Sequence, residues 1–296
     1  MKKIKLFGAI TALVTPFDEN GNVDIPALKG LVDFQIKNNI HGIVPCGTTG
    51  EAVTLNEQEY RLVLETVVKQ AGGRVPIIAG AGSNDTQKAI HYSQIAKEVG
   101  VDALLHVTPY YNKPTPNGLV AHFKAIARAV SLPIVLYNVP GRTGSNVSAA
   151  TTIRIAKEVP QVIAVKEASG NIQQMMEIIQ GVSPDFAVLS GDDAFTLPLM
   201  AVGGVGIISV ASNEIPKAMS DLTEAALKGD FQKAKKIHYK WLDLMNINFI
   251  ESNPIPVKTA LALMGKIKES FRLPLVNMEE KNRGKLTALL KSQKLI

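Results

Sequence analysis

A lysine ends an apolar run in the segment 162–170, Val-Ile-Ala-Val-Lys-Glu-Ala-Ser-Gly. An apolar run of this length with β-branched members predicts a strand that is buried on both faces. Lys166 at its carboxyl end would lose much of the hydration of its ammonium, and desolvation disfavours the charged form. Because a neutral amine attacks carbonyl groups, Lys166 is a candidate Schiff-base nucleophile. Its neighbour Glu167 points to the opposite face of a strand and does not simply neutralise it.

Side chains suited to proton transfer and carboxylate binding follow other predicted strands. A phenol and hydroxyl groups shuttle the protons that imine formation requires. Thr49 and nearby backbone N–H groups suit a carboxylate next to a ketone, and Arg142 suits a second carboxylate through bidentate hydrogen bonds. Three pairs of candidates follow predicted strands: Thr48 and Thr49 follow the strand 42–46, Tyr110 and Tyr111 follow the strand 103–107, and Tyr137 and Arg142 follow the strand 133–136. The backbone of Ile208, within the predicted strand 205–210, is a further candidate.

Each of these residues also has a simpler interpretation. A lysine stem can pack in a barrel wall while its head reaches water or a carboxylate. A tyrosine at a strand end is commonly a packing group, and a loop arginine is commonly a surface ion pair. Thr48 and Thr49, which lie between glycines, could form a turn that leads into a helix. The placement of all of them on successive loops favours the functional interpretation.

Eight strand–helix units account for this placement. Strands are predicted to start near residues 7, 42, 75, 103, 133, 162, 186 and 205, each followed by a helical stretch. This pattern and the chain length predict an α/β fold, a (β/α)₈ TIM barrel, in which the loops after the strands carry the chemistry. The alternative is a doubly wound open sheet with a glycine-rich dinucleotide turn. Residues 80–85, Gly-Ala-Gly-Ser-Asn-Asp, lack the third glycine of that turn.

The remainder of the chain is predicted to be mostly helical. We expect helices over 231–249, 254–264 and 279–291. No linker rich in proline, glycine or serine separates them from the preceding residues. The predicted organisation is therefore a catalytic barrel over residues 1–228 and a C-terminal helical extension over 229–296, packed on the barrel.

Composition narrows the function classes. The 296 residues carry a net charge of +6, 46% hydrophobic residues and 20% charged residues, as in an ordinary globular protein. Beyond Lys2, Lys3 and Lys5 there is no basic block, so we expect no nucleic-acid partner. No apolar run approaches the length of a membrane span. A single cysteine, Cys46, excludes an intrachain disulfide and suits a reducing compartment, and we expect a cytoplasmic protein.

The N-terminus has two interpretations. Lys2 to Lys5 and the apolar residues 6–14 imitate a secretory signal. We favour a first strand over 7–15, which ends at the turn residues 16–21.

Metal and cofactor chemistry is not expected. The five histidines do not pair at the spacing of metal ligands, and Asp192 and Asp193 form the acidic doublet that stands out. We therefore predict no metal ion and no cofactor.

Five sequence motifs carry a resemblance to a known family: Gly-Thr-Thr-Gly-Glu at 47–51, Val-Thr-Pro-Tyr-Tyr-Asn at 107–112, Tyr-Asn-Val-Pro-Gly-Arg-Thr-Gly at 137–144, Val-Lys-Glu-Ala-Ser-Gly at 165–170, and Asn-Pro-Ile-Pro-Val-Lys at 253–258. They resemble the dihydrodipicolinate synthase family, within the pyruvate-dependent class I aldolases. The likeness covers nearly the whole chain, and the first four motifs, in this order and spacing, are highly specific.

The resemblance implies a reaction and a set of catalytic roles. The reaction is the condensation of pyruvate with L-aspartate-4-semialdehyde to 4-hydroxy-tetrahydrodipicolinate, in lysine and diaminopimelate synthesis. Lys166 would form the Schiff base, and Tyr137 would donate and accept protons. Thr48 and Tyr111 would complete the relay, with Tyr111 supplied by a neighbouring subunit. The family is usually a homotetramer, a dimer of tight dimers.

The resemblance also implies binding residues and leaves alternatives open. Thr49 and Ile208 would hold pyruvate, and Arg142 the carboxylate of the semialdehyde. The nearest alternatives are an N-acetylneuraminate lyase or a 2-keto-3-deoxy sugar-acid aldolase, for which a polyhydroxylated aldehyde gives less reason for Arg142. An alternative of another class is a catalytically silent barrel that acts as a binding module.

One part of the sequence departs from the lysine-inhibited members of the family. Those members bind lysine in a pocket at the dimer interface. Lys88 stands where an acidic residue would meet the ammonium of the effector, so we expect inhibition by lysine to be weak or absent. The positions that correspond to the pocket are Ala52, Val53, Glu57, Tyr60, Asn84, Lys88 and Tyr110.

Overall fold

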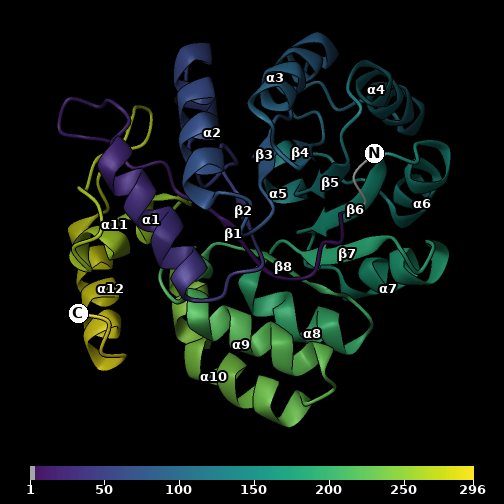
Figure 1. Cartoon of the computed structure of the whole chain (residues 1–296). Coiled ribbons are helices and arrows are strands. Elements are labelled where there is room, and N and C mark those ends of the chain that lie inside the picture. Colours follow the sequence, from purple (N-terminus) through teal and green to yellow (C-terminus); the bar gives the residue numbers. More distant parts are fainter. Residues whose placement is uncertain (1–3) are drawn as a thin grey trace.

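The computed structural model describes residues 4–296, so Lys2 and Lys3 of the basic N-terminal run lie outside the described residues. Eight strands form the centre of the molecule, and helices surround them (Figure 1). The strands are β1 (Gly8–Ala12), β2 (Gly42–Val44), β3 (Ile78–Gly80), β4 (Ala103–Val107), β5 (Ile134–Asn138), β6 (Val162–Glu167), β7 (Ala187–Ser190) and β8 (Gly206–Ser209).

The strands form one parallel sheet that closes into a barrel. Their order is β2-β1-β8-β7-β6-β5-β4-β3, and every pair is parallel. Backbone hydrogen bonds close the remaining gap between β2 and β3, from Ile43 to Pro76 and from Gly80 to Pro45, each at 3.0 Å. The predicted (β/α)₈ barrel is confirmed, and the open doubly wound sheet is wrong.

Helices connect the strands, and several begin at a capping side chain. Asp24 accepts a hydrogen bond from the Ala27 N–H, and Asn56 forms a capping box with Glu59. The helices that cover the barrel are α1 (Ile25–Lys37), α2 (Glu57–Ala71), α3 (Thr86–Val99), α4 (Pro116–Ala129), α6 (Ala149–Glu158), α7 (Ile172–Gly181), α8 (Thr196–Ala201) and α9 (Pro216–Leu227).

Helix α4 begins at Pro116, because Thr115 caps it and a proline is favourable in the first helical turn. The region after β5 differs from the prediction. Strand β5 extends to Asn138, and the short helix α5 (Pro140–Thr143) follows it in place of a loop. Tyr137 therefore belongs to a strand, and Arg142 to a helix.

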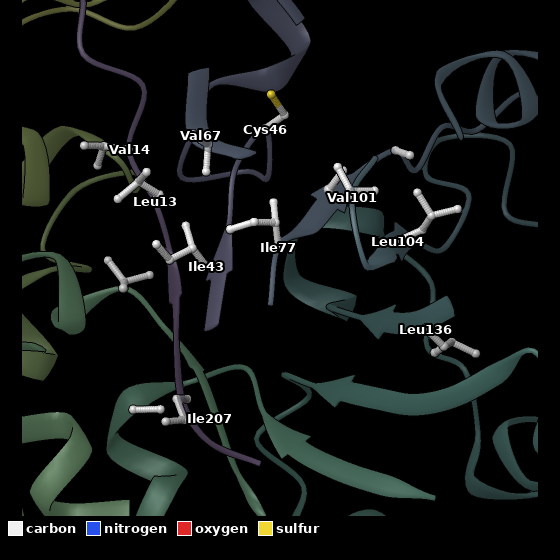
Figure 2. Close-up of a cluster of buried hydrophobic side chains, with 14 of the residues drawn as sticks. Leu13, Val14, Ile43, Cys46, Val67, Ile77, Val101, Leu104, Leu136 and Ile207 are labelled. Carbon is white, nitrogen blue, oxygen red and sulfur yellow. The ribbon is translucent and has the colours of Figure 1, made fainter. Parts of the chain in front are cut away.

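Side chains alternate between the two faces of the barrel wall. Leu104, Leu136 and Ile207 pack outward in the layer between strands and helices, part of which Figure 2 shows. Their neighbours Leu105, Tyr137 and Ile208 belong to a separate cluster that includes inward-facing residues of the other strands. This alternation directs alternate residues at the strand ends toward the barrel axis.

The C-terminal extension lies against one side of the barrel. Its helices are α10 (Phe231–Ile247), α11 (Ile255–Leu263) and α12 (Glu280–Ser292). Helix α10 packs against α9 and α12, and α12 packs against α11 (Figure 1). Within residues 4–296, no helix combines the length and apolar character that a bilayer crossing requires.

Candidate active site

Lys166 lies at the carboxyl end of β6 and faces the barrel interior. Its side chain is buried, and it pairs in the sheet with Tyr137 of β5. The Lys166 Nζ lies 4.1 Å from the centre of the Tyr137 ring. Glu167 faces outward, where its carboxylate accepts hydrogen bonds from Asn138 Nδ2 at 3.0 Å and Gln174 Nε2 at 3.1 Å. The prediction that Glu167 lies on the opposite face is confirmed.

The environment of Lys166 favours a neutral amine. Burial lowers the pKa of Lys166 to about 7, the Asp193 carboxylate opposes this change, and the Arg142 guanidinium adds to it. A substantial fraction of the amine is therefore unprotonated near neutral pH. This is the state that a nucleophilic lysine requires.

Tyr137 remains a protonated phenol next to this amine. Burial raises the pKa of Tyr137 to about 12, although the Arg142 charge and a hydrogen bond with Thr48 act in the opposite direction. A phenol that holds its proton at neutral pH can donate it and take it back during a reaction. The hydroxyl groups of Tyr137 and Thr48 thus lie together next to Lys166.

Asp193, which follows β7, forms hydrogen bonds with residues at the end of β8. Its buried carboxylate accepts hydrogen bonds from Ser209 Oγ at 2.5 Å and from the N–H groups of Val210 and Ala211 at 3.0 Å each. Burial raises the pKa of Asp193 to about 6 despite these bonds. The carboxylate holds the backbone that follows Ile208 in a fixed position.

A cavity of about 190 Å³ opens over Lys166 at this end of the barrel. It contains five of the predicted site residues, which come from three strand–helix connections, those of β2, β5 and β6. It also contains residues that follow β7 and residues of the C-terminal extension. The lining residues are Ala12, Val44, Gly47, Thr48, Thr49, Leu105, Tyr137, Val139, Arg142, Lys166, Ala168, Gly191, Asp192, Val210, Phe249 and Asn253.

Thr49 and Arg142 share a contact with Asn253. The buried Thr49 accepts a hydrogen bond from Asn253 Nδ2 at 3.0 Å. Arg142 Nη2 donates to the backbone carbonyl of Asn253 at 3.0 Å. The Arg142 side chain lies beside the cavity rather than on the protein surface alone, as a carboxylate-binding residue must.

Three predicted residues are not part of the cavity lining: Tyr110, Tyr111 and Ile208. Tyr110 is half-buried. Ile208 is fully buried and belongs to the barrel interior cluster that also contains Tyr137. Tyr111 is 89% exposed and has a φ of 70°, so its ring projects away from this chain. The structure brings the five remaining predicted residues together in the cavity and leaves Tyr111 at the surface.

The sequence prediction missed Asn253, Asp192 and Phe249 as residues of the cavity. Asn253 had a signal, because it begins the fifth of the matching segments. Asp192 was considered only as a metal ligand. In the described part of the chain, 4–296, no group of three or more histidine, cysteine, aspartate or glutamate residues is arranged to hold a metal ion.

A buried lysine at the end of a barrel strand, with a protonated phenol and carboxylate-binding side chains beside it, defines the class I, Schiff-base-forming aldolases built on a (β/α)₈ barrel. A sequence model of the dihydrodipicolinate synthetase family matches residues 5–293. The chain belongs to this family, as predicted.

Individual relatives agree along nearly the whole chain. The 4-hydroxy-tetrahydrodipicolinate synthase of Koribacter versatilis is 55% identical over 96% of this chain and 94% of its own. The protein of the same name from Maridesulfovibrio salexigens is 53% identical over 98% and 99%. The solved dihydrodipicolinate synthase of Acinetobacter baumannii, in complex with pyruvate, superposes with a TM-score of 0.97 at 46% identity and covers 99% of this chain and 100% of its own.

Proposed function

We propose that this chain is a lyase that condenses pyruvate with L-aspartate-4-semialdehyde to form 4-hydroxy-tetrahydrodipicolinate, in the synthesis of diaminopimelate and lysine. The observation that carries the proposal is the buried Lys166 beside Tyr137 in a cavity that also contains Thr49 and Arg142. The names of the close relatives support this substrate pair over a sialic acid or a sugar acid. They also disfavour a catalytically silent barrel.

The chemistry begins with the neutral amine of Lys166. It attacks the keto carbon of pyruvate, and loss of water from the carbinolamine gives an imine. Tyr137 and Thr48 carry protons to and from the reacting oxygen. Removal of a methyl proton gives an enamine, whose carbon attacks the aldehyde of the second substrate. The amino group of that substrate then attacks the imine carbon, which closes the ring and releases Lys166.

Binding is assigned to groups around this centre. Thr49 and the backbone of Ile208 hold the pyruvate carboxylate, and the end of β8 is fixed for this purpose by Asp193. Arg142 at the cavity binds the carboxylate of the semialdehyde through two parallel hydrogen bonds. A guanidinium suits a carboxylate better than it suits the hydroxyl groups of a sugar.

The exposed Tyr111 supports assembly of the protein with copies of itself. An aromatic ring that is 89% exposed, close in sequence to the strand ends that form the site, suits a residue donated to a neighbouring subunit. We therefore assign Tyr111 to the proton relay of the adjacent subunit in a homotetramer built from dimers. The small charged substrates and the free thiol of Cys46 fit an enzyme of the cytoplasm.

The experiment that tests the function is borohydride trapping with pyruvate. We expect a pyruvate-derived mass increase on the peptide that contains Lys166, found by intact mass and peptide mapping. The trapped enzyme identifies the first substrate, and turnover with aspartate semialdehyde against sugar aldehydes identifies the second. Arg142→Ala serves as the control, since it should weaken use of the semialdehyde and leave trapping intact. A folded protein that gives no adduct would refute the proposal.

The pH dependence follows from the lowered pKa of Lys166. The amine is a nucleophile only when unprotonated, so kcat/KM for pyruvate should rise with pH through about 7 and then level off. An ordinary lysine, with a pKa of 10.5, would place this rise far higher. In Asp193→Asn, loss of the carboxylate that raises the Lys166 pKa should move the rise to lower pH. Initial rates of the wild-type protein and of Asp193→Asn, measured from about pH 5.5 to about pH 10, cover the expected rise near pH 7 and extend toward the ordinary pKa of lysine. A rise above pH 9 in the wild-type protein would contradict the assignment.

Inhibition by lysine is expected to be weak or absent. The exposed ammonium of Lys88 would repel the ammonium of a lysine molecule in the corresponding pocket. Steady-state assays with added lysine test this directly, and Lys88→Glu should increase sensitivity to lysine. Strong inhibition of the unmodified protein at low millimolar lysine would contradict the prediction.

A further inference from the structure

Asn253 joins the C-terminal extension to the active site. It precedes α11, its side chain is buried, and it lines the cavity over Lys166. It lies 204 positions from Thr49 and 111 positions from Arg142 in the sequence, yet it contacts both. One residue outside the eight strand–helix units therefore contacts both side chains that are assigned to substrate carboxylates, those of Thr49 and Arg142.

The direction of the hydrogen bond between Asn253 and Thr49 determines what the threonine hydroxyl can do. The Asn253 Nδ2 is a donor only, whereas a hydroxyl has one proton and two lone pairs. Because the amide donates to Thr49 Oγ1, the hydroxyl keeps its own proton for another acceptor. Among residues 4–296, the Thr49 hydroxyl donates to no protein group, so this proton is available to a ligand in the cavity.

The chain segment that carries Asn253 has a second attachment to the segment that carries Thr49. Five residues further along, Lys258 of α11 forms a buried ion pair with Glu51, at 2.5 Å between Nζ and Oε1. Glu51 in turn follows Thr49 by two residues. The two segments are thus joined at two points, and a substitution at Asn253 leaves the second one intact.

We propose that Asn253 is a positioning residue for the bound carboxylate: its amide keeps Thr49 as a hydrogen-bond donor toward pyruvate, while its backbone carbonyl orients Arg142. The proposal rests on the proposed function, in which Thr49 binds the pyruvate carboxylate. The backbone contact with Arg142 does not depend on the side chain at position 253. Side-chain variants therefore isolate the effect on Thr49.

The deciding variant is Asn253→Asp, which has nearly the same shape and reverses the hydrogen bond. A carboxylate only accepts, so the Thr49 hydroxyl would turn its proton toward Asp and away from the ligand. We expect KM for pyruvate to rise roughly ten- to hundredfold, the effect of losing one hydrogen bond to a charged group, with a much smaller change in kcat at saturating pyruvate. Asn253→Ala leaves the hydroxyl free to rotate, so its KM should rise only severalfold.

A double-mutant cycle with Thr49→Val separates this effect from charge repulsion. In the Thr49→Val background there is no hydroxyl to reorient, so Asn253→Asp should raise KM far less than in the wild-type background. An equal rise in both backgrounds, or a folded Asn253→Asp protein with unchanged KM, would overturn the proposal.

Circular dichroism and thermal melting establish whether the variants fold. If Asn253→Asp does not fold, Asn253→Ala and Thr49→Val form the double-mutant cycle instead. Borohydride trapping of the wild-type protein with pyruvate, run alongside, tests the proposed function separately.

Discussion

Replacing Lys166 by methionine should abolish turnover while leaving the protein folded. Methionine fills a similar volume but has no amine, so no imine can form. We expect kcat to fall on the order of 10⁴-fold or more, since loss of the nucleophile in a hydrolase costs about 10⁶. Steady-state kinetics measure the loss, and borohydride treatment with pyruvate should leave the mass of the variant unchanged.

Two further variants separate the loss of the amine from other effects of the substitution. Lys166→Arg keeps a positive charge at the same site but cannot be deprotonated, and it should be as inactive as the methionine variant. Tyr137→Phe keeps the amine and removes the phenolic proton, so it should still be trapped by borohydride while kcat falls roughly 10²- to 10⁴-fold. Retention of more than a tenth of wild-type kcat in Lys166→Met would show that another group performs the chemistry.

Breaking the buried ion pair between Glu51 and Lys258 should strongly destabilise the fold. The Lys258 side chain is fully buried, the Glu51 side chain is 1% exposed, and the Lys258 Nζ also lies 4.3 Å from the centre of the Phe17 ring. Lys258→Met leaves a carboxylate buried without its partner, which costs about 3–5 kcal/mol of the free energy of unfolding. Urea unfolding followed by circular dichroism measures this change.

The matched control is an exposed ion pair with the same distance. Lys217 and Asp221 on α9 are also 2.5 Å apart, but their side chains are 57% and 36% exposed. Lys217→Met should lower the free energy of unfolding by less than about 1 kcal/mol, because water already solvates both charges. Adding Glu51→Gln to Lys258→Met removes the unpaired charge and should restore part of the stability. Equal unfolding midpoints for Lys258→Met and Lys217→Met would contradict this account.

The same ion pair links stability to the geometry of the site. It connects the segment that carries Thr49 to the helix that follows Asn253. Lys258→Met should therefore raise KM for pyruvate even under conditions where the variant is fully folded. The extension thus holds the segment that carries Thr49 through two contacts, from Lys258 to Glu51 and from Asn253 to Thr49.

Local sequence patterns were sufficient to predict the barrel and the five cavity residues that carry the candidate chemistry. Each strand is a short apolar run between turn residues, and hydrophobic periodicity of this kind depends only on neighbouring positions. All strands of a parallel barrel end on the same side, so Thr48, Tyr137 and Lys166, which lie at or just after strand ends, had to converge. Element ends were less predictable: β5 extends to Asn138, beyond the predicted end at 136, and the helix α5 follows where a loop was expected.

The tertiary structure alone decided three features of the site. Asn253 reaches Thr49 only because the chain returns to the barrel after 204 residues, and no local pattern encodes a contact at that separation. The pKa of Lys166 depends on burial by the whole barrel and on the position of the Asp193 carboxylate. The ring of Tyr111 is exposed, and its backbone adopts a positive φ. The sequence by itself determined which chemical groups lie at the ends of the strands, while packing between distant segments determined their charge, orientation and partners.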